Sequence, residues 1–207
     1  MKARRPIIIL LRLSEIFDMA KILTVSVAGI KIATATLNRL KQAAIDDIND
    51  EMYLSALAVQ EKAILNIRNN GANDQGFLLK GMVLQEDYAA RRFETGNIMY
   101  YSPYVEFGTG RKVSVPSEWA QYASQFKGKA NHGNFEQFVQ NLIDWMKRKG
   151  ITPNEGNDEK DYRHVAILMA MDIYQNGLTA RPFLYPAYQE VVKDLKKRVL
   201  AIIKKAT

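Results

Sequence analysis

The sequence predicts an α+β fold in which an antiparallel sheet packs against one long N-terminal helix, with additional helices toward the C-terminus. Three observations indicate this class. Residues 22–27 alternate between apolar and polar side chains, as a half-buried strand does. A helical pattern without Pro or Gly then runs from Thr36 to Asn69, and residues 77–107 follow it as short β-like runs. Helical patterns fill most of the remaining chain, an order typical of helices packed on one sheet.

Composition indicates a globular protein and excludes several kinds of chemistry. The 207 residues are 47% hydrophobic and 25% charged, with no Cys and two His. The lack of Cys excludes disulfides, thiolate nucleophiles and Cys-ligated metal centres. No apolar run approaches the roughly 20 residues that a membrane-spanning helix needs, so we expect no membrane partner.

The net charge of +7 lies at the two ends of the chain. Residues 1–21 carry five basic and two acidic groups, and residues 193–207 carry six basic groups and one acidic group. The residues between them hold 18 basic and 19 acidic groups, so the body of the protein is nearly neutral. A domain that follows a phosphate backbone usually has a basic face in its body. This distribution therefore favours basic ends on a neutral core.

Residues 1–18 precede the first predicted strand and admit two interpretations. Their apolar run, Ile7–Leu11, is five residues long before Arg12 interrupts it, which is too short for a signal peptide. The segment is either an extension upstream of a start at Met19 or a basic arm that docks on a partner. Residues 19–207 are expected to form a single domain.

The predicted long helix has a continuous apolar stripe and a clear end. Its buried face is expected to hold Leu37, Leu40, Ala44, Ile48, Met52, Ala56, Val59, Ala63 and Ile67 at spacings of three to four residues, and Leu57 and Ile64 widen this stripe. Asn69-Asn70-Gly71 is a strong helix stop. A helix of this length exceeds most helices of globular proteins, so we expect it to lean on a sheet or on other subunits.

Residues 77–107 have the pattern of strands joined by tight turns. Thr95–Asn97 places a Gly between two apolar runs and predicts a three-residue hairpin loop. Tyr104–Phe107 predicts a last strand, which Gly108 ends through a backbone conformation that other residues resist. The aromatic residues of this segment have a base-stacking platform as an alternative role. No Lys or Arg occurs in residues 95–110, which favours strand core instead.

Three further helices follow a long polar loop. The first begins after the N-cap Asn134 and ends before Gly150. The second ends at Asn176-Gly177, and the prolines of residues 180–186 keep that segment extended. The last helix is expected over Ala187–Lys205, with Lys and Arg side chains on its outer side.

No catalytic motif is present, so we expect no catalytic residue, no cofactor, no metal and no enzymatic activity. The glycines of residues 108–112 lack the spacing of a phosphate-binding loop, and no Gly-x-Ser-x-Gly elbow occurs. The two His lack the spacing of a zinc-ligand pair. A carboxylate-metal nuclease that uses Asp46, Asp50 or Asp158 is the weakest interpretation, because nothing in the sequence converges on these residues.

Three segments stand in a specific order after the long helix: Asp74–Leu78, Tyr101–Thr109 and Ala180–Ala187. They resemble three motifs of the phage tail-completion, or head–tail joining, protein family, which includes relatives of the minor tail protein Z of lambda-like phages. The motifs are Asp-Thr-Gly-x-Leu, from which Gln75 departs, Tyr-Ala-x-Tyr-Val-Glu-Phe-Gly-Thr and Ala-x-Pro-Phe-Leu-x-Pro-Ala. The motif and structural residues of these segments are Gly76, Leu78, Tyr101, Tyr104, Val105, Glu106, Phe107, Gly108, Thr109, Arg181, Pro182, Phe183, Leu184 and Pro186.

The resemblance covers residues 20–205, with residues 111–160 as an insertion relative to the shortest members. It implies a structural virion protein of a long-tailed bacteriophage, made in the host cytoplasm. This protein would lie at the neck or the head-proximal end of the tail, complete the tail and join it to the head. It would form a ring, most often of six copies, against neck, connector or tail-tube proteins, and meet DNA only as DNA passes through the neck. The motif residues are expected to be structural, with Glu106 facing away from its neighbours in a strand and contacting Arg181.

Charge indicates where copies of the chain would meet. The acidic residues of the long helix are typical of a solvated face. The alternative is that they and the basic residues of the last helix are mating surfaces, since complementary charge sets register. The alternative function is a basic DNA-binding accessory protein of the phage, which predicts steeply salt-dependent binding. The candidate interface residues are Asp46, Asp47, Asp50, Glu51, Lys193, Lys196, Lys197 and Arg198.

Overall fold

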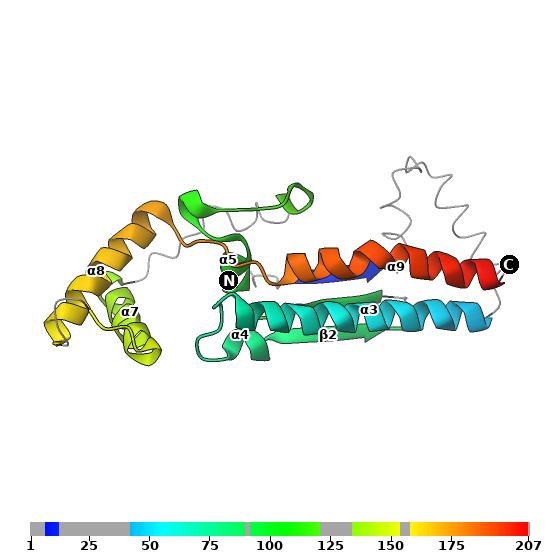
Figure 1. Ribbon diagram of the computed structural model, residues 1–207, viewed down its shortest axis with the longest axis horizontal. Coiled ribbons are helices and arrows are strands. Elements are labelled where there is room, and N and C mark those ends of the chain that lie inside the picture. The colour runs from blue at the N-terminus through cyan, green and yellow to red at the C-terminus, as the bar shows by residue number, and fades with distance from the viewer. Residues whose placement is uncertain (1–6, 13–41, 90–91, 121–133, 154–157, 207) are drawn as a thin grey trace. The chain divides into compact units, whose positions relative to one another are not determined.

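The computed structural model describes residues 7–12, 42–89, 92–120, 134–153 and 158–206 (Figure 1). The chain divides into two compact units. The sheet unit comprises Met1–Ser102 and Pro182–Thr207, and the helical unit comprises Pro103–Arg181. The expected insertion at 111–160 falls inside the helical unit.

The sheet has three antiparallel strands in the order β1-β3-β2. Register places Met82 opposite Asn97 and Asp87 opposite Arg92. The strand predicted at 22–27 lies outside the described residues. The predicted hairpin loop at 95–97 is wrong, because these residues are the last three of β3. The strands are β1 (Ile7–Arg12), β2 (Met82–Asp87) and β3 (Arg92–Asn97).

Two long helices complete the sheet unit: α3 (Gln42–Asn69) and α9 (Leu184–Ala206). At 1.5 Å per residue, the 28 residues of α3 extend about 42 Å. The start expected at Thr36 lies outside the described residues, while the predicted end is confirmed, with Gly71 at a positive φ of 70°. The last helix begins three residues earlier than expected. Pro186 fits in its first turn because backbone N–H groups there have no intrahelical partner.

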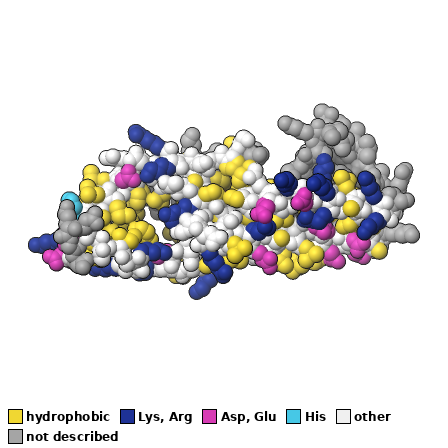
Figure 2. Space-filling view, in the orientation of Figure 1, with side chains coloured by type: hydrophobic (Ala, Val, Ile, Leu, Met, Phe, Trp, Pro, Cys, Tyr) yellow, Lys and Arg dark blue, Asp and Glu magenta, His cyan; other side chains and the backbone are white. Residues whose placement is uncertain are grey.

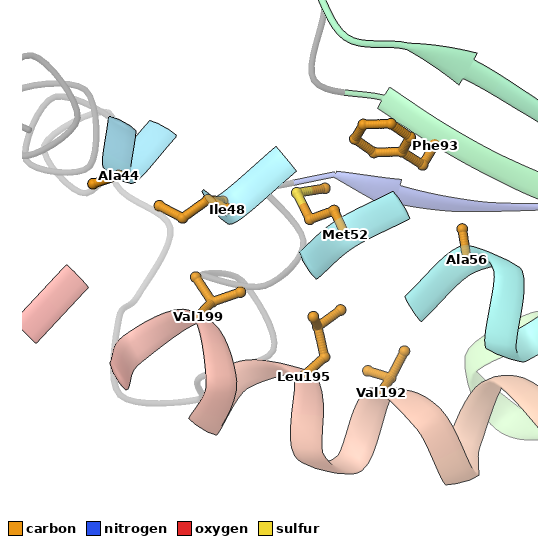
Figure 3. Packing of buried hydrophobic residues seen from close by; sticks show 8 residues of the cluster. All are labelled: Ala44, Ile48, Met52, Ala56, Phe93, Val192, Leu195 and Val199. Carbon is orange, nitrogen blue, oxygen red and sulfur yellow. The ribbon is translucent and has the colours of Figure 1, made fainter. Parts of the chain in front are cut away.

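The core of the sheet unit lies between α3, α9 and β3. Figure 3 shows side chains of α9 facing the apolar stripe of α3, with Phe93 reaching in from β3. Phe93 is fully buried, and its ring makes edge contacts with Tyr88 and Tyr53 at centroid distances of 5.0 and 6.2 Å. The predicted stripe is therefore confirmed over the described part of α3. The cluster comprises Ala44, Ile48, Met52, Ala56, Phe93, Val192, Leu195 and Val199.

Two short helices replace expected extended chain: α4 (Phe77–Lys80) and α5 (Ser102–Phe107). The predicted strand at 104–107 is thus wrong. Pro103 occupies the first turn of α5, where a missing N–H costs nothing, so local geometry overrides the β propensity of the aromatic and β-branched residues. As a consequence, Glu106 and Phe107 are both buried instead of facing opposite sides.

The helical unit is built around α7 (Phe135–Lys149) and α8 (Glu159–Asn176). The predicted caps of α7 are confirmed: Asn134 Oδ1 accepts from the Glu136 N–H at 3.0 Å, and Gly150 ends the helix with φ 65°. The predicted end of α8 at Asn176 is also confirmed. Single 3₁₀ turns, η1 (Gly110–Lys112) and η2 (Ser117–Trp119), follow α5. Within the described ranges, no helix combines the length and apolar character of a membrane span. The core comprises Val139, Ile143, Met146, Tyr162, Ala166 and Ala170.

Candidate functional site: where the motif segments lie

The first motif segment forms a turn that α4 continues. Gly76 precedes α4 with φ 80°, a left-handed conformation that favours Gly, and Leu78 is buried. The Leu78 carbonyl accepts a hydrogen bond from the Asn97 side-chain amide at 2.7 Å. The turn is therefore held to the end of β3 by a side chain outside the motif.

Asn97 is the structural residue that sequence analysis missed. It is fully buried, and besides its donation to Leu78 its Oδ1 accepts from the Met99 N–H at 2.9 Å. A Cβ added at Gly81 would lie 2.7 Å from Met99 Cγ and 2.8 Å from Asn97 Oδ1, so these side chains would have to shift. Its polar side chain was assigned to a turn, because Gly-Asn is a common turn pair. An Asn that ends a strand and bonds a neighbouring turn has the same sequence signature.

The second motif segment supplies Tyr101 and helix α5. Burial raises the pKa of the Tyr101 hydroxyl, and the nearby Tyr100 and Asp74 add to the shift. Tyr100 is largely exposed, which contradicts the expectation that the aromatic residues here form strand core. Phe107 is buried, and its ring contacts Trp119 edge-on at 5.9 Å between centroids.

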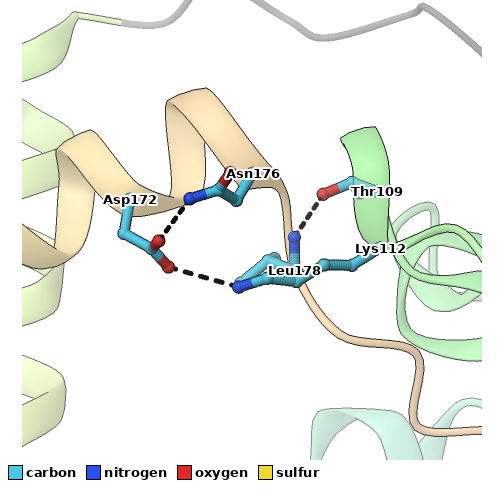
Figure 4. A network of polar contacts seen from close by, with 5 residues as sticks. All are labelled: Thr109, Lys112, Asp172, Asn176 and Leu178. Carbon is cyan, nitrogen blue, oxygen red and sulfur yellow. Dashed lines mark hydrogen bonds and ion pairs between the residues drawn. The ribbon is translucent and has the colours of Figure 1, made fainter.

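The second and third motif segments meet through main-chain atoms inside the helical unit. The Val105 carbonyl accepts from the Arg181 N–H at 2.8 Å, and the Leu178 carbonyl accepts from the Thr109 N–H at 2.9 Å. The Thr109 hydroxyl accepts from the Leu178 N–H at 2.7 Å (Figure 4). The pairs 105–181 and 109–178 run in opposite directions along the chain. We name this antiparallel contact of 105–112 with 172–181 the motif junction.

Glycines allow the close approach of the two backbones in the motif junction. Gly108 has φ 74°, and an added Cβ would lie 2.7 Å from the Leu178 carbonyl and 2.8 Å from the Ala180 nitrogen. A Cβ at Gly177 would overlap the Thr109 carbonyl. The prediction that Gly108 has a backbone conformation other residues resist is confirmed, although it follows a helix instead of ending a strand.

A network of polar side chains links the two segments of the motif junction. Asp172 accepts from the Asn176 side-chain amide at 2.6 Å and from Lys112 Nζ at 3.2 Å (Figure 4). These hydrogen bonds, and then the charge of Lys112, hold the pKa of Asp172 below its ordinary value. The predicted side-chain contact between Glu106 and Arg181 stays a prediction. What joins their segments is the main-chain bond of Val105.

The third motif segment continues into the sheet unit, where it anchors α9 to the end of α3. Phe183 and Leu184 are fully buried, as expected of anchor residues. The Pro182 and Phe183 carbonyls accept from the side-chain amides of Asn70 and Asn66, at 3.1 and 2.9 Å. Side-chain amides in the last turn of α3 and just after it thereby satisfy backbone carbonyls before α9 begins.

Several of the charged interface candidates are paired within the chain, and most of the candidates are exposed to solvent. Glu51 binds Arg198, which also donates to the Ser55 hydroxyl at 3.0 Å, so this pair joins α3 to α9. Asp46 accepts from Gln42 at 2.8 Å, and Lys197 lies 3.4 Å from Asp194. The exposed members of the two candidate sets are Asp46, Asp47, Asp50, Lys193, Lys197 and Arg198, while Glu51 and Lys196 are half-buried.

The carboxylates of the nuclease interpretation belong to different units of the chain. Asp46 and Asp50 lie on α3 in the sheet unit, whereas Asp158 caps α8 in the helical unit through a capping box with Asp161. The part of the chain that the structure describes holds no group of three or more side chains able to bind a metal ion.

Comparison of the chain with family models, curated proteins and solved structures finds no match.

Proposed function

We propose that the protein is a structural component of the virion of a long-tailed bacteriophage. It acts at the neck or the head-proximal end of the tail, where it completes the tail and joins it to the head. It works by assembling as a ring of several copies, six by the family resemblance, against neck, connector or tail-tube proteins. No chemical turnover is part of this role.

The motif junction is the observation that supports this proposal best. Val105 of the second motif and Arg181 of the third are joined by a main-chain hydrogen bond, and Gly108 sits where an added Cβ would clash with main-chain atoms. The matched residues are therefore the ones that shape the chain, as expected if the resemblance reflects a shared fold. Their roles are burial, turn formation and main-chain pairing. These roles suit a protein that presents surfaces for assembly.

The proposal is tested by electron microscopy of lysates from a phage with a stop codon at Leu37. Full heads beside separate tails of normal length are expected. Abnormally long tails would assign the protein to tail termination instead of joining. The matched control carries a synonymous change at Leu37, and a plasmid copy of the full chain should restore joined virions.

Intact, infectious virions from the stop-codon phage would overturn the structural proposal. The DNA-binding alternative would then be tested by titrating the purified protein with duplex DNA at several salt concentrations. Binding that weakens steeply with salt would support that alternative, because phosphate contacts release counterions.

A further inference from the structure

The outward face of α3 carries exposed leucines among acidic side chains. Leu54 and Leu65 are 55% and 52% exposed. They are eleven residues apart, three helical turns, and therefore lie on the same face. Asp47, Asp50 and Glu61 are exposed and fall on this face too, at spacings of four and seven residues from the leucines. We name these five residues the acidic leucine face.

The outward face of α9 has the opposite charge, and its residues are spaced by three to four positions. Leu200 is 39% exposed. Lys193, Lys197 and Lys204 precede or follow it by seven, three and four residues, so all four side chains share one face. We name them the basic leucine face. Figure 2 shows Lys and Arg side chains gathered over α9, with Asp and Glu side chains over α3.

Among the described residues, the side chains that join α3 to α9 lie outside the two leucine faces. The intrachain contact employs Glu51 with Arg198, and Lys62 with Glu190. Neither pair belongs to the two leucine faces. Alternating spacings of three and four residues on both faces are typical of a helix–helix seam. Single exposed leucines are common, but here the leucines stand among charges of opposite sign on two faces of one unit, so the two faces are complementary in charge.

We propose that the acidic leucine face of one copy docks on the basic leucine face of the next copy. The two faces differ, so the contact is heterologous, and a heterologous contact that closes by rotation forms a ring. The leucines supply apolar burial, and the charges fix register and exclude the wrong pairing of like faces. This inference rests on the proposed ring function and names the surface that would build it.

Charge reversal tests the pairing in purified full-length protein. The acidic-face variant is Asp50→Lys/Glu61→Lys, and the basic-face variant is Lys193→Glu/Lys197→Glu. Each variant alone is expected to weaken self-association by more than about tenfold in sedimentation velocity, since like charges then face one another. An equimolar mixture of the two variants should recover assembly. The acidic-face variant then carries two basic faces, and the basic-face variant carries two acidic faces. Only unlike variants can therefore pair, and they alternate around a ring with an even number of copies.

Matched controls place the same charge changes elsewhere on the sheet unit. Glu86→Lys on β2 and Lys80→Glu on α4 reverse exposed charges outside both leucine faces and should leave assembly unchanged. Circular dichroism of every variant checks that the chain folds. Leu54→Ala and Leu200→Ala offer a second route that leaves charge untouched, and both should weaken assembly.

Three results would overturn the inference. They are a wild-type chain that stays monomeric at about 0.1 mM, single variants that assemble like the wild type, and a mixture that fails to recover assembly. None of them would by itself remove the proposed virion role, because the stop-codon lysate reports that role separately. Separate heads and tails in that lysate, with no effect of the charge variants, would keep the function and reject this surface.

Discussion

Different kinds of contact stabilise the core of the sheet unit and the motif junction of the helical unit. In the sheet unit, apolar side chains such as Met52, Phe93 and Leu195 fill the space between two helices and a strand. In the motif junction, main-chain atoms meet directly and glycines leave room for them. Shortening a side chain should therefore lower stability most in the core of the sheet unit, whereas adding a side chain should lower it most in the motif junction.

The two regions can be monitored separately. Both tryptophans, Trp119 and Trp145, belong to the helical unit. Trp119 contacts Phe107 beside the motif junction, and Trp145 packs against the core of α7 and α8. Tryptophan fluorescence therefore follows the helical unit, whereas far-ultraviolet circular dichroism follows both units.

The largest effect is expected from Phe93→Ala in the sheet unit. Phe93 is fully buried, so its loss removes apolar burial and leaves a cavity, which should lower the free energy of unfolding by about 3–5 kcal/mol. Urea unfolding followed by circular dichroism measures the change. The control Phe135→Ala removes a ring that is 38% exposed and should cost far less. Equal losses for both variants would contradict the assignment of Phe93 to the core.

The next effect comes from adding a methyl group to the motif junction. Gly108→Ala should lower the stability of the helical unit by roughly 2–4 kcal/mol, through a left-handed φ and a clash with the Leu178 carbonyl. Gly150→Ala is the matched control, because its φ is also positive but nothing lies within 4 Å of the added Cβ. It should cost about 1 kcal/mol, from strain alone. Tryptophan fluorescence in urea measures both, and a similar loss in the two variants would reject the close approach.

A smaller effect is expected where a side chain binds main-chain groups. Asn97→Ala removes the bonds to the Leu78 carbonyl and the Met99 N–H in a buried place, which should cost about 1–3 kcal/mol. The control Gln85→Ala changes an exposed residue of the neighbouring strand β2 and should cost less than about 0.5 kcal/mol. A neutral Asn97→Ala would show that the turn before α4 holds without this residue.

The smallest effect concerns the exposed pair of Lys112 and Asp172. The pKa of Asp172 is lowered in the folded chain, so its contribution to stability is present above the unfolded pKa of about 3.9 and is lost as pH falls through the lower folded value. Asp172→Asn should therefore be slightly less stable than the wild type at pH 7. Thermal melts across pH 2–7 should show this difference disappearing at the acidic end. A difference that stays constant with pH would show that the carboxylate charge is not its source.

The elements of the fold that sequence predicted well are those with a strong local signal. The apolar stripe of α3 was predicted together with its buried hydrophobic residues, and Asn134 and Gly150 mark the ends of α7 with side-chain and backbone chemistry that is typical of helix caps. The order of sheet and helices followed from these signals, and the α+β class is confirmed.

The predictions were wrong for short segments whose residues are compatible with two kinds of secondary structure. The segment 104–107 has β propensity, but Pro103 starts a helical turn there and tertiary packing buries Glu106. Contacts between distant segments have no local signal at all. The pairing of Val105 with Arg181 depends on backbone atoms that every residue carries, so only the required glycine at 108 was visible in the sequence.

The contact of α3 with α9 has a consequence for how the chain folds as it is made. Between these two helices the ribosome must synthesise the whole helical unit, which has its own core and is complete at Arg181. The helical unit can therefore fold first. Until α9 has been synthesised, the apolar stripe of α3 lacks this partner and is exposed. During this interval the nascent sheet unit is the part of the chain most exposed to aggregation. A chaperone that binds apolar helices would protect it until Leu195 and its neighbours emerge.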